Sequence, residues 1–351
     1  MTLARGSRSS TWLWLGLAVL VLLAVVPTVV IDNPAVLNIL VITLMYVALS
    51  SAWNLGCGYS GYISLGHAAF FGFGAYALGL LVNQLVATNM EIGGPYGPFL
   101  LAPVIGLLTA AVAIPFGWIA FRTRLTAFVI VTIALMFVVQ SLALNMRDVT
   151  GGSQGLGFPV GPWGSSYGVP FYYAMLLIAA VVVLLSWIIR RSNFGLGLLA
   201  IHDDEDRAQA AGVPTGTYKL AAFVVSAGLF GMIGGIYGYY LTYIYPQFAV
   251  DPLLAASVVL MSFLGGVGTV LGPVLGAAIV EPSQLLLSYY VNEALYLILY
   301  GTLFLVVVLF LPRGILPSMG DRLESWRAGR RIRAATPETP GLTPPGPSEK
   351  A

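Results

Sequence analysis

The sequence predicts an all-α integral membrane protein with about ten transmembrane helices, some of them broken or rich in glycine. Of the 351 residues, 58% are hydrophobic and only 9% are charged, whereas soluble domains carry about 25% charged residues. The mean hydropathy is +0.89. Uncharged runs of about 20 residues, the length that a spanning helix needs, recur along the chain. These three observations exclude a water-soluble core.

The first apolar run, Trp12–Ile31, follows a short basic segment, residues 1–11, that we expect to be a cytoplasmic tail. The run is longer than a signal-peptide core and is followed by no clear cleavage site, so we expect it to be retained as the first span. Further runs of spanning length lie at Pro34–Trp53, Tyr59–Val82, Pro98–Phe121, Leu125–Asn145, Val169–Ile189, Leu220–Tyr245 and Ala294–Leu311.

The region Pro252–Tyr290 is too long for one span and is interrupted by glycines at Gly265–Pro273. Lys and Arg collect on the cytoplasmic side of membrane proteins. If the chain crosses here twice, with a cytoplasmic turn near Gly265–Thr269, both termini lie in the cytoplasm and Arg147 is the only Lys or Arg outside. We therefore predict ten spans.

The end of the chain, residues 317–351, is rich in Pro, Thr and Arg and has almost no bulky apolar residues. Such a segment cannot bury a core, so we expect a disordered cytoplasmic tail. Its arginines either touch anionic lipid headgroups or remain solvated. The transmembrane domain then covers residues 12–316.

A charged island, residues 190–219, lies between two apolar runs. Acidic residues at 203 and 204 are suited to cap a helix of one to two turns, and a glycine at 212 is placed to end it. Small alanines along this helix would let another protein approach closely. The island is either such a docking surface or a solvated connecting loop. Its candidate docking residues are Asp203, Asp204, Glu205, Ala208, Ala211 and Gly212.

Two glycine-rich segments, Asn54–Tyr76 and Gly265–Gly276, interrupt the apolar runs in the two halves of the chain. Interrupted segments in both halves point to a transport path, although tight helix packing alone also explains them. The histidine at 67 is either functional or a hydrogen-bonded structural residue. Polar candidates along the path are Asn54, Ser64, His67, Gln140 and Asn145.

Signatures of an enzyme or a resident cofactor are missing from the sequence. It contains no GxxxxGK[ST], HExxH, CxxC or GxSxG motif, and its single cysteine, Cys57, excludes a multi-cysteine metal site. Glu281 is the one acidic residue predicted at mid-depth in the membrane. It either lines a polar interior or shows that the helix boundary there is misplaced, and we favour the second interpretation.

Four segments resemble the LivM-type permease of branched-chain amino acid ABC importers. The resemblance extends from about residue 35 to 316. One departure is His202, where the family usually carries arginine. The matching segments are Asn54–Tyr76 with its SLGHAAF sequence, Ser192–Ala227, Leu264–Ala277, and Tyr300-Gly301 together with Pro312-Arg313-Gly314.

This resemblance implies a multi-pass protein of the bacterial inner membrane that does no chemistry itself. It implies a LivH-like partner permease, two ABC ATPases of the LivG and LivF type that bind the ATP, and an extracytoplasmic substrate-binding protein. No nucleic acid is involved. The island would be the coupling helix, centred on Asp203–Gly212, that enters a groove in an ATPase.

The substrates that the resemblance implies are isoleucine, leucine and valine, with urea or short amides as the alternative. An ion-coupled secondary transporter is an alternative of another class. Such transporters more often carry intramembrane Asp or Glu, for which Glu281 is the candidate here.

Overall fold

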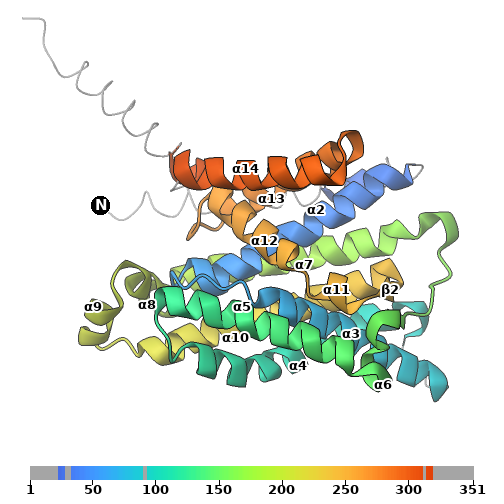
Figure 1. The fold of residues 1–351 in the computed structure, drawn as a ribbon, viewed down its shortest axis with the longest axis horizontal. Helices are drawn as coiled ribbons and strands as arrows, with labels where there is room; N and C mark the ends of the chain where they lie inside the picture. Colours follow the sequence, from blue (N-terminus) through green and yellow to red (C-terminus); the bar gives the residue numbers. More distant parts are fainter. Residues whose placement is uncertain (1–22, 28–32, 90–92, 311–313, 319–351) are drawn as a thin grey trace, which may run out of the picture.

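A computed structural model describes residues 23–27, 33–89, 93–310 and 314–318, and shows a bundle of helices (Figure 1). Seven helical stretches in these residues are long and apolar enough to cross a membrane. The protein is therefore a multi-pass, all-α membrane protein, while the predicted count of ten spans is not established. The tails 1–11 and 317–351 and the first predicted span, Trp12–Ile31, lie wholly or mainly outside the described residues.

Most of the long helices follow the predicted apolar runs, but the helix expected at Tyr59–Val82 begins only at His67 and continues to Ala87. The long helices are α2 (Pro34–Trp53), α3 (His67–Ala87), α4 (Gly97–Ala120), α5 (Leu125–Asn145), α7 (Gly168–Arg191), α10 (Thr215–Leu241), α12 (Pro252–Gly265), α13 (Gly272–Tyr290) and α14 (Glu293–Phe310). A π-helical turn, Asn54–Gly58, extends α2.

Local sequence explains where several helices begin. Asn33 caps α2 by accepting a hydrogen bond from the Val36 N–H, and Pro34 occupies the first turn. Ser192 ends α7 with an extended backbone, and its side chain accepts a hydrogen bond from the Gly195 N–H. The same serine therefore ends α7 and starts α8 (Asn193–Asp203).

Helix α10 lies at the centre of the bundle and packs against α3 and α4. Small residues make this packing possible, as is usual between membrane helices. A Cβ atom on Gly74 of α3 would lie 2.0 Å from the carbonyl oxygen of Gly231 in α10. A Cβ atom on Gly231 would in turn lie 2.1 Å from the Thr109 hydroxyl of α4. At these two glycines the helices are thus packed so closely that any larger residue would clash with the neighbouring helix.

The region 252–290 forms two helices, α12 and α13, which pack against each other. The turn between them covers residues 266–271, close to the predicted turn at Gly265–Thr269. Gly266 and Gly268 have φ angles of 122° and 76°, which favour glycine. The expected interruption by a glycine turn is thus present, whereas the double crossing of the membrane stays a prediction.

Glu281 lies in the middle of α13, not at a boundary, so the interpretation we favoured for it is wrong. Its side chain is buried, and its Oε2 atom has no hydrogen-bond partner among the described residues. Ser283 and Gln284 follow shortly after it, so the carboxyl group lies in a short polar stretch of an otherwise apolar helix.

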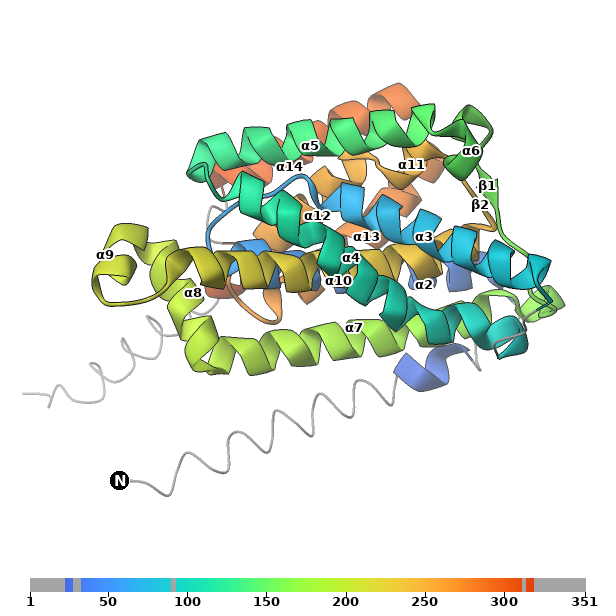
Figure 2. The ribbon, with the colours of Figure 1, turned by 90° about the horizontal axis from the view of Figure 1, so that it is seen from below.

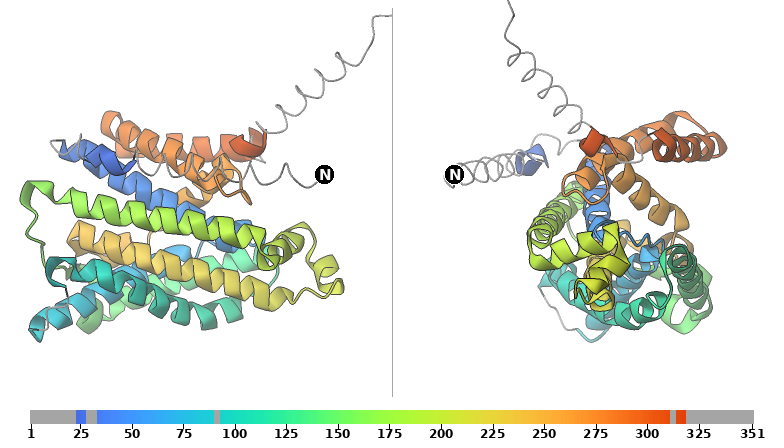
Figure 3. Two further views of the ribbon diagram at one scale, coloured as in Figure 1. Left: turned by 180° about the vertical axis from the view of Figure 1, so that it is seen from behind. Right: turned by 90° about the vertical axis from the view of Figure 1, so that its left-hand side faces the viewer.

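Short elements gather at the two ends of the bundle (Figure 2). Helix α8 and helix α9 (Glu205–Ala210) project at one end. Figure 3 (right) views the molecule from this end, with the olive α8–α9 segment in front. Toward the other end lie helices α6 (Arg147–Thr150) and α11 (Pro246–Ala249). There, strands β1 (Leu156–Gly157) and β2 (Tyr243–Ile244) form an antiparallel pair, with Leu156 opposite Ile244.

Candidate functional site

Helix α9 has the capping residues that its sequence predicts. The Asp204 carboxylate accepts a hydrogen bond from the Arg207 N–H at 3.0 Å and pairs with the Arg207 side chain at 3.0 Å. At the other end Gly212 has a φ angle of 89°. This left-handed conformation stops the helix and turns the chain toward α10. The prediction of a short helix capped by an acidic residue and ended by Gly212 is confirmed.

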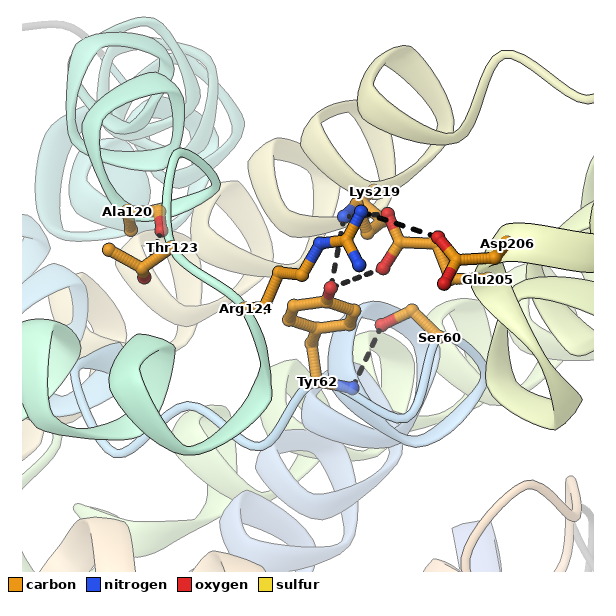
Figure 4. Close-up of polar contacts among 8 residues, drawn as sticks. All are labelled: Ser60, Tyr62, Ala120, Thr123, Arg124, Glu205, Asp206 and Lys219. Carbon is orange, nitrogen blue, oxygen red and sulfur yellow. Dashed lines mark hydrogen bonds and ion pairs between the residues drawn. The ribbon is translucent and has the colours of Figure 1, made fainter. Parts of the chain in front are cut away.

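Three side chains from distant parts of the chain join α9 to the bundle (Figure 4). They are Tyr62, Glu205 and Lys219, which we call the anchor triad. The Lys219 ammonium group lies 2.5 Å from Glu205 Oε1 and donates to the Tyr62 hydroxyl at 3.2 Å. The Tyr62 hydroxyl donates to Glu205 Oε2. Each polar group of the triad is thus bonded to the other two.

Burial and hydrogen bonding together determine the protonation states of Glu205 and Tyr62 in the anchor triad. Burial by itself raises the pKa of Glu205, but hydrogen bonds from Lys219 and Tyr62 outweigh it and lower the pKa below 4.5. Burial raises the pKa of the Tyr62 hydroxyl, and the hydrogen bond to the Glu205 carboxylate raises it further. The triad therefore contains an ionised carboxylate and a neutral phenol at neutral pH.

Contacts around the triad attach α9 to the turn between α4 and α5. The Tyr62 ring meets the rings of Phe121 and Phe128 edge-on, at centroid distances of 5.7 and 5.3 Å. Arg124 pairs with Asp206 at 3.3 Å, but both side chains are largely exposed, so this pair adds little stability. The buried triad and its rings hold α9 in place.

The six predicted docking residues do not form one surface. Asp203, Ala211 and Gly212 are exposed, and Asp204 is half-buried as the helix cap. Two residues are corrected here: Ala208 is only 4% exposed, and the Glu205 carboxylate is bonded inside the protein. Helical periodicity turns these two positions toward the bundle. The exposed face of α9 carries instead Asp206, Arg207, Gln209 and Ala210.

Two of the five predicted path residues, Ser64 and His67, lie together in a buried network. His67 Nδ1 is 3.0 Å from the Ser64 hydroxyl, and Nε2 is 3.0 Å from the Ser226 hydroxyl. The Ser226 hydroxyl donates a hydrogen bond to the Ala52 carbonyl oxygen at 2.8 Å. Because its single hydrogen is used there, it accepts a hydrogen bond from His67 Nε2. The imidazole is fully bonded and joins α3 to α2 and α10.

The other three predicted path residues lie apart. Asn54 holds the 266–271 turn by accepting from the Gly268 N–H and donating to the Thr269 carbonyl oxygen. Gln140 donates to the Val250 carbonyl oxygen at 2.8 Å. Asn145 is exposed at the end of α5 and bonds within its own helix. The structure therefore does not bring the five together.

A cavity of about 410 Å³ lies where α2, α3 and α10 meet the β2–α11 segment. None of the five predicted path residues lines it. Sequence reasoning missed this cavity and the anchor triad. A signal for the triad was Lys219, a lysine within the first turns of an apolar helix. A signal for the cavity was the aromatic run between Tyr237 and Phe248 next to Asp251.

Comparison with known proteins gives a consistent result. The family model described as "Branched-chain amino acid transport system / permease component" matches residues 35–308. The high-affinity branched-chain amino acid transport system permease protein LivM of Salmonella typhimurium is 27% identical over 82% of this chain and 71% of its own length. The corresponding LivH protein of Escherichia coli is 21% identical over 77% and 91%.

A relative with another named substrate also matches. The galactose/methyl galactoside import permease protein MglC of Haemophilus influenzae is 27% identical over 59% of this chain and 63% of its own length. No solved structure matches the chain.

Proposed function

The chain belongs to the family of branched-chain amino acid transport system permease components, and from this premise we propose that it forms the translocation path of an ATP-binding-cassette importer for branched-chain amino acids. The family match over residues 35–308 carries the proposal. LivM- and LivH-named relatives both match, which supports a second, LivH-like permease as partner. Two ATPase subunits and an extracytoplasmic binding protein complete the proposed importer.

The position of α9 supports a role in coupling to the ATPases. It lies at one end of the bundle, its outer face is exposed, and its inner face is bonded to α10 and the loop before α3. Movement of α9 is therefore transmitted through these contacts to α10, the central helix. The ATPases drive transport by binding one permease conformation better than the other.

Charge distribution supports the proposed orientation in the bacterial inner membrane. Arg122 and Arg124 lie in the α4–α5 turn, on the same end as α9 and its triad. Arg147 lies in α6, toward the opposite end. The positive-inside rule then places α9 in the cytoplasm and the β1–β2 pair outside. We extend this orientation to both termini, which we propose to be cytoplasmic.

The alternatives differ in substrate and in energy source. Urea or a short amide remains an alternative substrate, and the MglC match shows that similarity at this level includes a permease named for a sugar. An ion-coupled secondary transporter would use a buried carboxyl group such as Glu281. In our proposal the permease is not an enzyme and holds no cofactor, because its partners bind and hydrolyse the ATP.

Uptake by the complete complex in proteoliposomes tests the proposal. We expect ATP-dependent uptake of leucine, isoleucine and valine that requires the ATPases and the binding protein. Uptake driven by an ion gradient without the ATPases would establish the secondary transporter instead. Uptake of urea in preference to leucine would establish the amide importer.

Substitutions on α9 test the coupling role. Ala210→Trp and Ala211→Trp place bulk on the exposed face, and we expect both to abolish transport-stimulated ATP hydrolysis with membrane insertion intact. Leu107→Trp is the matched control, because Leu107 is 74% exposed on α4, away from α9. Normal transport-stimulated ATP hydrolysis in both α9 variants would show that this face of α9 does not contact the ATPases.

A further inference from the structure

The cavity at the β2–α11 segment has walls of an unusual composition for a membrane protein. One wall comes from α2 and α3, the other from the end of α10 and the segment that follows it. Among the described residues that line the cavity, Asp251 is the only charged one. The aromatic residues of the lining are Tyr46, Phe71, Tyr237, Tyr243, Tyr245 and Phe248.

The cavity lies far from α9. Lys219 and Tyr237 are 18 positions apart on α10, which corresponds to about 27 Å at the usual helical rise. With α9 in the cytoplasm, the cavity lies toward the outer side. Phe248 in its wall is 71% exposed, so the cavity has an open side. Its volume falls within the range of small-molecule sites, about 300–1,000 Å³.

Irregular backbone forms part of the cavity wall. Residues 242–251 contain a strand of two residues and a helix of four, between the long helices α10 and α12. Ala249 in this stretch packs against Gly72 of α3, where a Cβ atom would lie 2.6 Å from the Ala249 carbonyl oxygen. Membrane proteins tolerate such backbone at depth only where it is buried in protein or lines a polar cavity.

The Asp251 carboxylate has capacity for a ligand. Its Oδ1 atom accepts a hydrogen bond from the Leu253 N–H at 2.8 Å and caps α12. Within the described part of the chain no Lys, Arg or His pairs with it. A carboxylate without a partner cation, in a cavity that tyrosine rings also line, favours a bound cation through charge and through the ring faces.

A second carboxyl group, that of Glu281, lies near the cavity wall. Glu281 interacts electrostatically with Tyr46 and Tyr237, two residues of the lining. Glu281 itself is nearly fully buried, and its Oε2 atom has no hydrogen-bond partner among the described residues. No basic residue is found among the described residues that line the cavity.

We propose that this cavity binds the amino-acid substrate by its ammonium group, with Asp251 and the tyrosine rings as the ammonium site and Met45 and Leu254 against the aliphatic side chain. The inference rests on the proposed function and specifies the substrate class, because urea and simple short amides without an amino group carry no ammonium group. In the described part of the lining the substrate carboxylate finds no cationic partner. The site therefore recognises the amine end of the molecule.

Binding of radiolabelled leucine to the complete transporter complex in nanodiscs, without the binding protein, tests the site. Asp251→Asn removes the charge but keeps a side-chain oxygen that caps α12, so folding is preserved. We expect the affinity to fall by about tenfold or more, since a charge-assisted hydrogen bond is lost. Asp148→Asn is the matched control, because Asp148 is exposed on α6 toward the same end, and we expect unchanged affinity.

Competition identifies the group that is recognised. Leucine amide retains the ammonium group and should displace leucine, whereas N-acetyl-leucine and urea should not. Equal binding by Asp251→Asn and the wild type, equal competition by N-acetyl-leucine and leucine amide, or no leucine binding by the wild type would each overturn the inference. ATP-driven leucine uptake by the wild type would in those cases leave the proposed function intact, and its absence would overturn that function separately.

Discussion

The ammonium group of Lys219 lies 2.5 Å from the carboxylate of Glu205, although the two residues belong to different helices. Lys219 belongs to α10, the central helix of the bundle, and its side chain is only 5% exposed. Glu205 is the first residue of α9, the helix that projects from the end. A buried pair of opposite charges thus makes the junction between the projecting helix and the core.

Breaking this pair from one side should destabilise the protein. Glu205→Gln leaves the Lys219 ammonium group buried without its counter-charge, which we expect to cost about 2–3 kcal/mol, below the about 3–5 kcal/mol of fully buried pairs because Glu205 is partly exposed. A thiol-reactive dye can follow thermal unfolding, since Cys57 is buried and is the only cysteine.

The double variant Glu205→Gln/Lys219→Met is the control for this prediction. It removes both charges, so its stability should recover part of the loss seen in Glu205→Gln. If the losses measured separately for Glu205→Gln and Lys219→Met simply add in the double variant, the two charges do not interact.

The same pair gives a pH dependence with a defined sign. The pKa of Glu205 in the folded protein is lowered from 4.5, because hydrogen bonds from Lys219 and Tyr62 outweigh the opposing effect of burial. A lowered folded pKa means that the stabilisation is complete above pH 4.5 and is lost as the pH falls through the folded value. We expect the difference in melting temperature between the wild type and Glu205→Gln to be constant near neutral pH and to shrink below pH 4.5. A difference that grows on acidification would contradict the assignment.

Part of this arrangement was predictable from the sequence. Apolar runs of spanning length gave the long helices, and local capping chemistry gave the start and end of α9. The anchor triad was not predictable, because Tyr62 and Lys219 are 157 positions apart and only tertiary packing brings them together. The assignment of Ala208 to the docking surface failed because six residues of helix cannot show which face turns inward. The expected path residues were chosen by polarity, whereas Asn54 and His67 use their polar atoms within the bundle.

Asn54 should be needed for stability. Its amide accepts from the Gly268 N–H at 2.8 Å and donates to the Thr269 carbonyl oxygen at 2.7 Å, so it holds the turn between α12 and α13. Asn54→Ala leaves both backbone groups without this partner, and we expect a loss of about 1–3 kcal/mol. Asn145→Ala is the control, since Asn145 is exposed and its amide donates to the Ser141 carbonyl oxygen within its own helix. The melting temperature of the control should match that of the wild type. An equal decrease in melting temperature in both variants would show that Asn54 does not stabilise the turn between α12 and α13.

The close contact between α3 and α10 predicts opposite effects at two glycines. A Cβ atom on Gly74 would lie 2.0 Å from the Gly231 carbonyl oxygen, and backbone cannot move aside easily. We expect Gly74→Ala to destabilise the protein by about 1–3 kcal/mol. At Gly216 of α10 a Cβ atom would meet nothing within 4 Å, so Gly216→Ala should be neutral or stabilising by up to about 1 kcal/mol. Thermal unfolding of both variants tests this prediction. A Gly74→Ala variant as stable as the wild type would show that α3 and α10 are less closely packed.

Tyr62 should affect coupling more than folding. Tyr62→Phe keeps the ring against Phe121 and Phe128 but removes the hydroxyl that bonds to both Glu205 and Lys219. Helix α9 then loses the hydrogen bond between Tyr62 and Glu205, so motion of α9 should be transmitted less completely. We expect the ratio of leucine transported to ATP hydrolysed to fall at least about twofold, with a stability loss of about 1–3 kcal/mol.

The neighbouring Tyr59 is the matched control for this coupling effect. Its hydroxyl bonds to the Ser186 side chain of α7 at 2.6 Å, in the same loop region but away from α9. Tyr59→Phe should therefore lower the melting temperature by a similar amount and leave the ratio of transport to hydrolysis unchanged. Because the two variants lose the same chemical group, a difference between their ratios can arise only from the place of that group in the structure. Equal ratios in Tyr62→Phe and Tyr59→Phe would show that the anchor triad stabilises α9 without transmitting its motion.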